Sequence, residues 1–546
     1  MFFIKFEIQK PDLTQFKQLA LFLEKNPVYI HGFIILLLLP ALLINLGLYP
    51  FNLDEATRAI VVLEMKFSGN FIIPSINGEF YYNKPPLFNW IQLLFVQCSG
   101  SMEEWVFRLP VVISLLGFGL TVFMTLRKEL GYRVGLLATL AVITSGRILF
   151  YDSFKGLIDI TFSWTIYLIF WNIYNNFSKG RILRLFVFSW FLTALGFLLK
   201  GMPSLVFQGI SLVVYFIYQK SFRKLFSIQH FTGLLIFLTL VGGYLALYNH
   251  GNSLTDYVAN LWNEAAIRTP IGNSFLLTIS HFIAFPFNFI SYFLPWSLLV
   301  FCFFSDGVIK NIWQDKFLRF LTIIFISNIF VYWISPAIYP RYLFMFLPPL
   351  FAILFYVYEN NERISRISKN ILKPFLYIFP LLIAMGLWFL AVRMDSPHQS
   401  HIPGKILFLS FIAVVLCGLY ILFAKERIFI LMGFILFGRI AFNFFIFDER
   451  LQSGIDAYQR EDTIKVAVMT KGRPLYLYKD CPIHKSSTFY IERERQEILF
   501  RWKGEMEKGK QYIIPETEIN KIQACKKLAV FETNLAFLNL CVVELE

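Results

Sequence analysis

The chain has 546 residues, of which 57% are hydrophobic, 18% aromatic and only 16% charged. Its mean hydropathy is +0.59. A chain of this size with so few polar residues cannot cover itself with the surface that a water-soluble globule requires, so that class is excluded. The composition predicts an α-helical polytopic membrane protein.

Apolar segments long enough to cross a bilayer recur along most of the chain. A hydrocarbon core of roughly 30 Å requires about 20 apolar residues in one helix. We therefore expect about 13 transmembrane helices, at residues 28–48, 105–126, 134–151, 157–176, 184–199, 202–218, 230–248, 279–304, 318–335, 342–358, 371–392, 404–423 and 427–446.

Lysine and arginine predict the orientation of these helices, because both are enriched in cytoplasmic loops. Basic connections occur at every second loop, for example "RKELGYR", "SKGR", "QKSFRK" and "ENNERISRISKNILK". These loops fall on the same side as the N-terminus, which we expect to be cytoplasmic. The formal net charge of +14 follows largely from this bias, and no segment resembles a nucleic-acid-binding module.

Residues 447–546 differ in composition from the membrane part, residues 1–446. Their apolar runs are short and alternating ("PLYLY", "SSTFYI", "QYIIP", "LAVFE", "LCVVELE"), and charged helix-like pieces such as "IERERQEILFRWKGEMEKG" separate them. This pattern predicts a small α/β domain. An odd number of spans places it outside the cytoplasm, on the periplasmic side in a bacterium.

Three of the six cysteines, Cys481, Cys525 and Cys541, lie in this C-terminal region. An oxidising compartment permits one disulfide bond and one remaining thiol. Three unpaired structural cysteines are equally compatible with the sequence.

Two outer loops are long, at residues 49–104 and 249–278. By periodicity, the first contains two interfacial amphipathic helices, Leu53 to Phe67 and Pro86 to Cys98, the second of which has proline in its first turn. Carboxylates and cations gather in these loops and at the outer ends of the spans, namely Asp54, Glu55, Arg58, Lys84, Arg147, Asp152, Lys155, Asp159, Lys200, Glu264, Arg268 and Arg341. The positive-inside rule predicts few cations there, so we interpret the cluster as a site for an anionic substrate.

Some of these residues have a second interpretation. Asp54 and Glu55, followed by Arg58, also fit a solvated helix start, where the helix dipole favours acids. Lys84, which precedes two prolines, also fits a side chain that reaches from the membrane to the water interface. Asp159 lies within an apolar stretch, where acidic residues are costly and usually functional.

The order of the motifs resembles one known superfamily. "LDEATR" follows the first span, "YYNKPPL" comes about 30 residues later, and "GLIDITF" starts the fourth span. "LKG" precedes the sixth, a helix ends in Arg268, and "PRYL" lies late in the chain. This order is similar to that of the aminoarabinose transferase and protein O-mannosyltransferase superfamily, which are type-C glycosyltransferases (GT-C) with an outer C-terminal domain.

The resemblance implies a polyprenyl-phosphate sugar donor and an inverting displacement. A departing phosphate requires cationic or neutral hydrogen-bond donors, for which the candidates are Lys84, Lys200, Arg268, Arg341 and Tyr342. By its position in the family, Asp54 orients or deprotonates the acceptor hydroxyl. Glu55 positions Asp54 or binds the acceptor, and Asp159 holds sugar hydroxyls or orients a cation.

One departure from the family concerns a metal. The residue before the motif lysine is typically Glu in aminoarabinose transferases, where it contributes to a metal site; here it is Asn83. A neutral amide is a poorer ligand for a divalent cation. The sequence therefore leaves the metal open, and the sole cofactor it leaves to consider is a divalent cation.

The expected partners are thus the lipid-linked donor, membrane lipids and an acceptor that is lipid A, a glycan or a protein, at the outer face of the inner membrane. A lipid or polymer transporter, including a flippase, is the alternative function. Transporters commonly place their charged site near the bilayer midplane, within inverted repeats. Here the charges cluster at one interface, and no internal repeat is evident, which favours the enzyme.

Overall fold

The computed structural model describes residues 13–52, 54–267, 273–360, 366–393, 402–453, 455–522, 525–533 and 539–545. The chain forms two compact units. The smaller unit consists of Met1–Ile44 and Leu372–Phe445, and the larger unit consists of Asn45–Ile371 and Ile446–Glu546. The predicted domain boundary between residues 446 and 447 stays a prediction.

The smaller unit is helical. Its elements are α1 (Leu13–Lys25), α2 (Val28–Leu36), α3 (Leu38–Leu43), most of α17 (Arg366–Arg393), α18 (Ile402–Leu422), η6 (Ala424–Glu426) and most of α19 (Arg427–Ser453). His31 on α2 forms a buried pair with Glu426, with 3.0 Å between His31 Nε2 and Glu426 Oε2. The pair joins α2 to η6, the turn that precedes α19.

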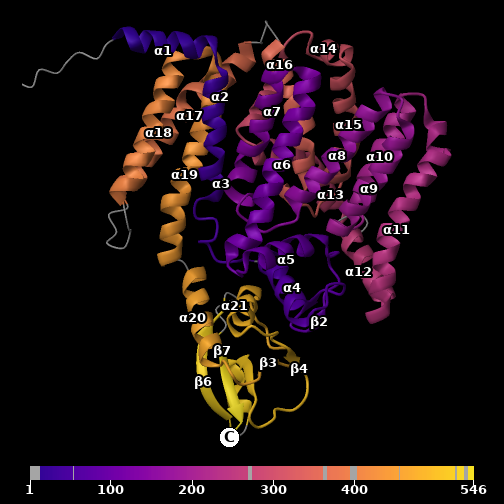
Figure 1. Cartoon of the computed structure of the whole chain (residues 1–546), viewed down its shortest axis with the longest axis vertical. Helices are drawn as coiled ribbons and strands as arrows, with labels where there is room; N and C mark the ends of the chain where they lie inside the picture. The colour runs from indigo at the N-terminus through magenta and orange to yellow at the C-terminus, as the bar shows by residue number, and fades with distance from the viewer. Residues whose placement is uncertain are drawn as a thin grey trace, which may run out of the picture. The chain divides into compact units, whose positions relative to one another are not determined.

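The larger unit contains a bundle of helices, which Figure 1 shows in colours from purple through magenta to salmon. The helices are α6 (Glu104–Leu130), α7 (Tyr132–Thr144), α8 (Asp159–Ser178), α9 (Ile182–Lys200), α10 (Pro203–Tyr218), α11 (Ile228–Gly251), α12 (Leu254–Ala266), α13 (Phe275–Tyr292), α14 (Val308–Gln314), α15 (Lys316–Trp333) and α16 (Leu347–Asn360). Short turns connect them at η1 (Ile148–Asp152), η2 (Phe222–Phe226), η4 (Trp296–Phe304) and η5 (Pro340–Phe346).

The chain is a multi-pass membrane protein, but with fewer long spans than predicted. Among the described residues, 8 helices are long and apolar enough to cross a membrane, or up to 9 if the bent pair Lys17–Lys25 and Val28–Leu43 counts as one span. The 13 expected spans exceed this number because several apolar runs form shorter or broken helices. The run at 134–151 ends as a helix at Thr144 and continues in the turn η1, and α10 has 16 residues.

The first outer loop forms the two expected helices, α4 (Asp54–Ser68) and α5 (Leu87–Ser99), joined through the hairpin of β1 (Ser75–Ile76) and β2 (Glu79–Phe80). Leu53, the expected first residue of α4, lies outside the described residues. Every residue of α4 from Glu55 to Met65 is buried. This helix is therefore packed on all sides over most of its length and does not present one apolar face, as an amphipathic surface helix would.

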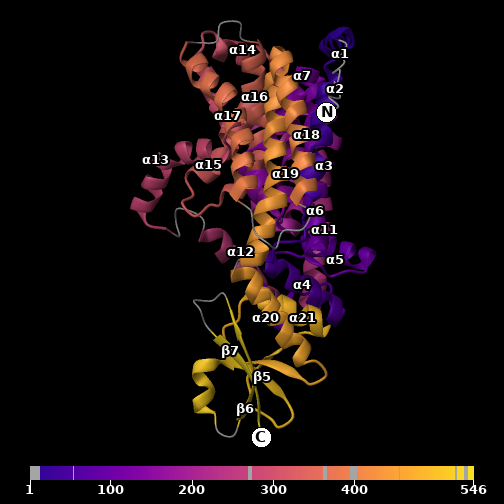
Figure 2. The same cartoon turned by 90° about the vertical axis from the view of Figure 1, so that its left-hand side faces the viewer.

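The C-terminal region forms the predicted sheet. Its five strands lie in the order β4-β3-β5-β7-β6, in which β3 pairs in parallel with β4 and β5, and the pairs with β7 are antiparallel. The strands are β3 (Leu475–Tyr478), β4 (Arg501–Trp502), β5 (Gln511–Pro515), β6 (Cys525–Glu532) and β7 (Asn539–Leu545), with the turn η7 (Glu516–Lys521) after β5. Helices α20 (Ile455–Met469) and α21 (Lys485–Arg495) accompany the sheet (Figure 2).

One predicted strand is wrong. The run "SSTFYI", residues 486–491, lies inside α21 and not in the sheet. His484 caps this helix by accepting a hydrogen bond from the backbone N–H of Ser486, and the residues from Ser487 to Arg493 are buried. Burial on several faces removes the polar and apolar alternation that separates a helix from a strand.

Helix α21 packs directly against α4, so the C-terminal region contacts the loop that begins with Asp54. Phe489 of α21 stacks edge-on against Phe51 and Phe107, with ring centres 4.7 and 5.5 Å apart. The Tyr490 hydroxyl accepts a hydrogen bond from the backbone N–H of Phe51 and donates one to Glu104. Figures 1 and 2 both show α4 between the helix bundle and the C-terminal sheet.

The cysteines do not pair. Cys481, Cys525 and Cys541 are all free thiols, as are the other three cysteines of the chain. Of the two alternatives that the sequence left open, the structure shows the unpaired one.

Candidate active site

The site begins where two antiparallel helices meet. Helices α8 and α9 are joined by a tight turn, so the first residue of α8, Asp159, lies beside the last residue of α9, Lys200. The helix dipoles favour an acid at the first position and a base at the second. Lys200 Nζ lies 2.5 Å from Asp159 Oδ1, and only 7% of Asp159 and 6% of Lys200 are exposed.

Turn η5 adds a second cation. Its Arg341 lies between two carboxylates: Nη2 is 2.5 Å from Asp54 Oδ2, and Nε is 3.3 Å from Asp159 Oδ2. Tyr342 follows it, and the Lys200 ammonium lies 3.8 Å from the centre of the Tyr342 ring. Asp54 differs from these neighbours because 60% of its side chain is exposed.

Lys84 and Glu264 close another side of the site. Lys84 Nζ lies 3.9 Å from Glu264 Oε2 on α12, and the two side chains are 16% and 29% exposed. The preceding residue, Asn83, accepts a hydrogen bond of 3.2 Å from Asn260, also on α12. The loop before α5 is thus attached to α12 by two polar contacts.

Together these residues line a polar cavity of about 150 Å³. Among the described residues it contains three carboxylates and four cations, which are Asp54, Asp159, Glu264, Arg58, Lys84, Lys200 and Arg341. Three tyrosines, Tyr81, Tyr339 and Tyr342, also line it. The excess of cations at a partly dehydrated surface favours an anionic ligand.

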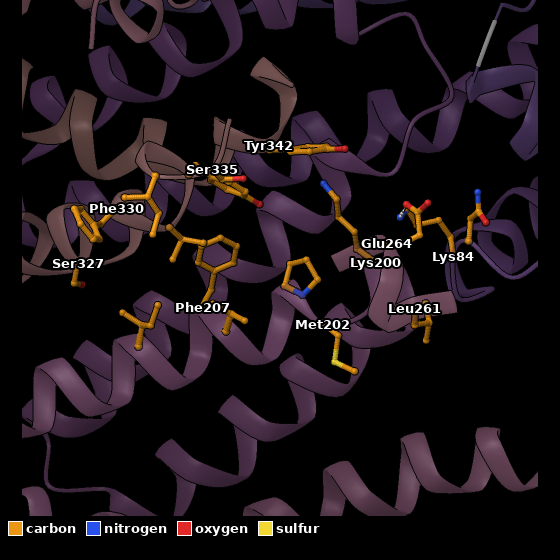
Figure 3. A pocket seen from close by; sticks show the side chains of 17 residues that line it. Lys84, Lys200, Met202, Phe207, Leu261, Glu264, Ser327, Phe330, Ser335 and Tyr342 are labelled. Carbon is orange, nitrogen blue, oxygen red and sulfur yellow. Dashed lines mark ion pairs between the residues drawn. The ribbon is translucent and has the colours of Figure 1, made fainter. Parts of the chain in front are cut away.

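A larger and apolar groove of about 420 Å³ adjoins this cavity. The two share Asn83, Lys84, Lys200, Glu264 and Tyr342. Figure 3 shows Lys84, Lys200 and Glu264 together at one end of the groove, while Phe207 and Phe330 lie along its length. The groove therefore ends at two lysines, which is the arrangement that fits a long apolar ligand with an anionic head.

The predicted site residues are placed as follows. Asp54, Asp159, Lys84, Lys200, Arg341 and Tyr342 all line the cavity. Glu55 does not, because its carboxylate points into the protein. Arg268 lies outside the described residues, so its predicted role stays a prediction.

Glu55 is held by three donors. Its Oε1 accepts from Arg108 Nε at 2.7 Å and from the backbone N–H of Gly156 at 2.7 Å, and its Oε2 accepts from Arg108 Nη2 at 3.0 Å. Glu55 and Arg108 are both buried. This fixed pair holds α4 to α6 and to the segment before α8, so the expected binding of the acceptor by Glu55 does not fit its position.

Sequence reasoning placed Arg58 in the outer charge cluster without giving it a role, and it did not select several other residues that shape the site. Arg58 donates hydrogen bonds to Tyr81 and to Asn89 on α5. Burial raises the pKa of the Tyr81 hydroxyl, so this phenol stays protonated. Arg108 was missed because its charge falls inside an apolar run, and the signal that could have found it is that intramembrane charges usually have a partner. Tyr339 lies two residues before Arg341 in the same motif and carried no signal of its own.

The residues present do not fit a divalent cation. The described residues contain no group of three or more His, Cys, Asp or Glu side chains that could hold a metal ion. Asn83 Oδ1 is already used by Asn260, and the ammonium of Lys84 lies beside Glu264. The positive charge of a lysine at that distance repels a divalent cation.

The sequence of residues 83–245 matches the family model described as dolichyl-phosphate-mannose-protein mannosyltransferase. A relative at 24% identity over 367 residues, which are 65% of this chain and 70% of that protein, is an uncharacterized protein of Aquifex aeolicus (strain VF5). The family match covers the segment from Asn83 to Leu245, in the second half of α11, and includes Lys84, Asp159 and Lys200.

The fold is similar to that of ArnT from Cupriavidus metallidurans, which has been solved bound to undecaprenyl phosphate and in the apo state. The bound structure has a TM-score of 0.67 at 18% identity, and the match covers 94% of this chain and 97% of that one. The apo structure has a TM-score of 0.65 at 16% identity, with 94% and 98% covered. The predicted fold, a helical membrane protein with a small C-terminal sheet domain, is confirmed, and it is similar to that of ArnT.

Proposed function

We propose that this protein is an integral membrane glycosyltransferase that moves a sugar from a polyprenyl-phosphate donor to an acceptor. One observation carries the proposal: the apolar groove of about 420 Å³ ends at Lys84 and Lys200, where it meets the polar cavity. A polyprenyl chain fits the groove by burial of apolar surface, and its phosphate fits the lysines. The match to ArnT, which was solved with undecaprenyl phosphate, supports the same donor class.

The roles of the cations follow from where they lie. Lys84 and Lys200 belong to both groove and cavity, so they bind the donor phosphate before and after transfer. Arg341 lies deeper, between Asp54 and Asp159, and stabilises the negative charge that develops on the leaving phosphate. Tyr342 contributes a neutral hydroxyl beside Lys200, and Arg268 is the further candidate.

The reaction is a displacement at the anomeric carbon. The bond between the sugar and the phosphate oxygen breaks, and polyprenyl phosphate leaves with the electron pair. The acceptor oxygen forms the new bond from the opposite face, which inverts the anomeric centre, and its proton passes to Asp54 when the acceptor is a hydroxyl. Asp54 suits this role because it is the most exposed of the three carboxylates that line the described cavity.

Asp159 has a positioning role in this proposal. Its two oxygens contact Lys200 and Arg341 separately, at 2.5 and 3.3 Å, so it fixes both cations in place. Groups that are held before the reaction need no reorganisation when charge develops. Holding sugar hydroxyls, the other role expected for Asp159, would require it to release one of these cations.

The decisive experiment measures donor binding and transfer with the same protein. Polyprenyl phosphate is titrated into detergent-solubilised wild type, Lys84→Ala, Lys84→Arg and the control Lys66→Ala, whose lysine lies on α4 outside the cavity. We expect Lys84→Ala to lose roughly 1.5 to 3 kcal/mol of binding, the value of a hydrogen bond to a charged group. Lys84→Arg keeps the charge and loses less, and Lys66→Ala binds as wild type does.

The second arm separates the enzyme from the alternative, a flippase for a lipid-linked glycan. A synthetic polyprenyl-phosphate sugar is supplied, and sugar transfer and movement of the lipid between the leaflets of vesicles are both followed. Transfer that is lost in step with donor binding supports the enzyme. Lipid movement without any cleavage of the glycosidic bond favours the flippase, and unchanged binding in Lys84→Ala rejects the phosphate role.

We also propose that the protein lies in the inner membrane with a cytoplasmic N-terminus and a periplasmic C-terminal domain, so that the site faces outward. The distribution of lysine and arginine supports this orientation. The test is cysteine labelling in a cysteine-free background. Lys508→Cys, which is exposed in the C-terminal region, should react with an impermeant reagent in intact cells, whereas Lys179→Cys, exposed after α8, should react only after permeabilisation. The reverse pattern would overturn the orientation.

A further inference from the structure

The segment between α7 and α8 carries two cations around one aromatic ring, outside the cavity described above. The guanidinium carbon of Arg147 lies 3.7 Å from the centre of the Tyr151 ring, and Lys155 Nζ lies 3.6 Å from the same centre. Tyr151 is 40% exposed, and Arg147 and Lys155 are partly exposed. Both positive groups therefore lie against the same partly exposed ring.

Arg147 uses only part of its hydrogen-bonding capacity. Arg147 donates from Nε to Asp152 Oδ2 at 2.7 Å, and Asp152 is buried, with 2% of its surface exposed. Within the described part of the chain, neither Nη group of Arg147 has an acceptor, and no carboxylate lies within 4 Å of Lys155 Nζ. One buried carboxylate thus faces two cations, which leaves a net positive charge at the surface.

This segment lies next to the Asp54 end of the cavity. Gly156, which follows Lys155, donates its backbone N–H to Glu55, the neighbour of Asp54, at 2.7 Å. Leu157 and Ile158 then line the cavity together with Asp54. The apolar groove reaches the cavity from its other side and includes none of these three residues. The cations therefore flank the side that the donor groove does not occupy.

We infer that Arg147, Tyr151 and Lys155 form a second anion-binding subsite, which holds a phosphate group of a lipid acceptor and so positions it against Asp54. The inference rests on the proposed function, because it assumes that the donor enters through the groove. Arg147 offers its Nη groups and Lys155 an ammonium, a combination that suits a phosphate dianion. Tyr151, between two cations at the ends of apolar helices, suits the headgroup level of a membrane.

A lipid acceptor is favoured over a peptide by what the segment contains. Peptide recognition commonly uses a free strand edge, an apolar groove for a helix, or pockets for side chains. The described residues of this segment form a short π-helical turn, η1, and a bend, with charged groups outside, and α7 and α8 are apolar. An acidic peptide is therefore treated as an outcome of the test that contradicts the inference.

The test uses purified full-length protein with its donor site filled by saturating polyprenyl phosphate. Binding of short-chain phosphatidic acid is compared with that of the matching diacylglycerol in wild type, Lys155→Gln, Lys155→Arg and Arg147→Gln. Lys155→Gln is the principal variant, because it removes a charge that pairs with no carboxylate among the described residues. Lys179→Gln, at the far end of α8, is the matched control.

We expect wild type to bind phosphatidic acid more tightly than diacylglycerol. Lys155→Gln and Arg147→Gln should each weaken phosphatidic acid binding about tenfold to a hundredfold, the loss of one charged hydrogen bond. Lys155→Arg should retain most of it, and Lys179→Gln all of it. In the transfer assay, the KM for a phosphorylated acceptor should rise while kcat and the KM for the donor stay within about twofold, a split that a merely structural defect does not produce.

Three results would overturn the inference: no preference for phosphatidic acid in wild type, unchanged binding in Lys155→Gln, or saturable binding of an acidic peptide with no binding of the lipid. Competition by millimolar inorganic phosphate as strong as that by phosphatidic acid would show that free phosphate, and not a lipid, is the ligand. Donor binding is measured separately with polyprenyl phosphate alone. Its failure counts against the proposed function and leaves the preference for phosphatidic acid as an independent result.

Discussion

Asp54 and Glu55 are neighbours in the first turn of α4, yet they belong to different environments. Asp54 is 60% exposed, faces the cavity and, among the described residues, pairs with Arg341. Glu55 is 3% exposed and accepts hydrogen bonds from Arg108 and Gly156. A carboxylate that is exposed beside a cavity can accept a proton from a substrate, whereas a buried one that already accepts three hydrogen bonds holds the structure together.

A second buried carboxylate, Glu104, contacts the C-terminal region. Glu104, which begins α6, is fully buried and receives the Tyr490 hydroxyl at 2.9 Å, Arg460 at 3.4 Å and Arg493 at 3.5 Å. These three partners come from α20 and α21. Charged residues therefore have two roles here. Those of the cavity serve the proposed chemistry, and those around Glu104 hold the C-terminal region against the start of α6.

The largest expected effect is on Asp54. Asp54→Asn keeps the shape of the side chain but cannot accept a proton, so turnover should fall by about 10² to 10⁴, the usual cost of losing a general base. Thermal unfolding should change little, because the side chain is largely exposed. The measurement is sugar transfer by purified protein.

Glu79→Gln is the matched control for Asp54→Asn. Glu79 is also an exposed carboxylate of the first outer loop, but it pairs with Arg501 and Lys503 and does not line the cavity. It should keep normal turnover. Near-normal transfer by Asp54→Asn, or an equal loss in Glu79→Gln, would remove Asp54 from the mechanism.

The fold could be predicted from the sequence to a large extent. Apolar runs fix the membrane class, and the two loop helices were placed within one residue of α4 and α5. The meeting of Asp159 with Lys200 follows from two antiparallel spans joined by a short turn. What failed was the number of long spans and the strand at residues 486–491, because neither run length nor alternation reveals where a helix breaks or which faces become covered.

Within the site, the sequence could identify residue types but not their neighbours. Nothing in the sequence "LDEATR" distinguishes the role of Asp54 from that of Glu55. The structure does, because Arg108 binds the carboxylate of Glu55. Likewise, nothing in the sequence indicates that α21 covers α4, since that contact joins segments more than 400 residues apart. Long-range contacts of this kind are set by packing of the whole chain.

The second prediction concerns Glu55. Glu55→Gln leaves the buried Arg108 without its charge partner, which should destabilise the protein by about 3 to 5 kcal/mol. Turnover per folded molecule should remain near that of wild type, the opposite of Asp54→Asn. Thermal unfolding in detergent and active-site titration measure the two quantities.

A double variant tests the origin of that loss. Replacing the pair together, as Glu55→Leu with Arg108→Met, should recover stability, because apolar residues of similar volume often replace a buried ion pair without cost. If the Glu55→Gln protein folds properly but loses most of its turnover, Glu55 takes part in the chemistry instead.

The third prediction concerns pH. Glu64 on α4 and Glu492 on α21 are both buried. Burial raises the pKa of Glu64, and burial together with Glu64 raises that of Glu492 well above its usual value. The folded state therefore favours the protonated form. Its stabilising effect is complete below the ordinary carboxyl pKa and is lost as the pH rises through the raised values, by up to about 1.4 kcal/mol for each unit of elevation.

Unfolding of the wild type should thus become easier as the pH rises, measured as thermal unfolding across a pH series. In Glu492→Gln, an amide replaces the proton-bearing carboxyl, so the protein should lose most of this dependence and be more stable at the alkaline end. Glu64 accepts hydrogen bonds from Ser75 and from the backbone of Asn77 and Gly78, so the same substitution there should be more harmful. Identical pH profiles for wild type and Glu492→Gln would contradict the assignment.

The smallest effect is expected for Tyr490→Phe. The hydroxyl joins the backbone N–H of Phe51, at 3.1 Å, to Glu104, at 2.9 Å, while the ring packs within the apolar cluster around Phe489. Phenylalanine keeps the ring, so only these hydrogen bonds are lost, at about 1 to 3 kcal/mol for a buried acceptor left with fewer donors. Arg460 and Arg493 remain as donors to Glu104 and limit the loss.

Tyr478→Phe is the matched control. Tyr478 lies on β3, and its hydroxyl makes no hydrogen bond to the described residues, so its removal should be neutral. Because Phe51 lies three residues before Asp54, a loss of turnover in Tyr490→Phe larger than its loss of stability would show that the docked C-terminal region also orients the catalytic carboxylate, and the separation between the two environments would then be incomplete.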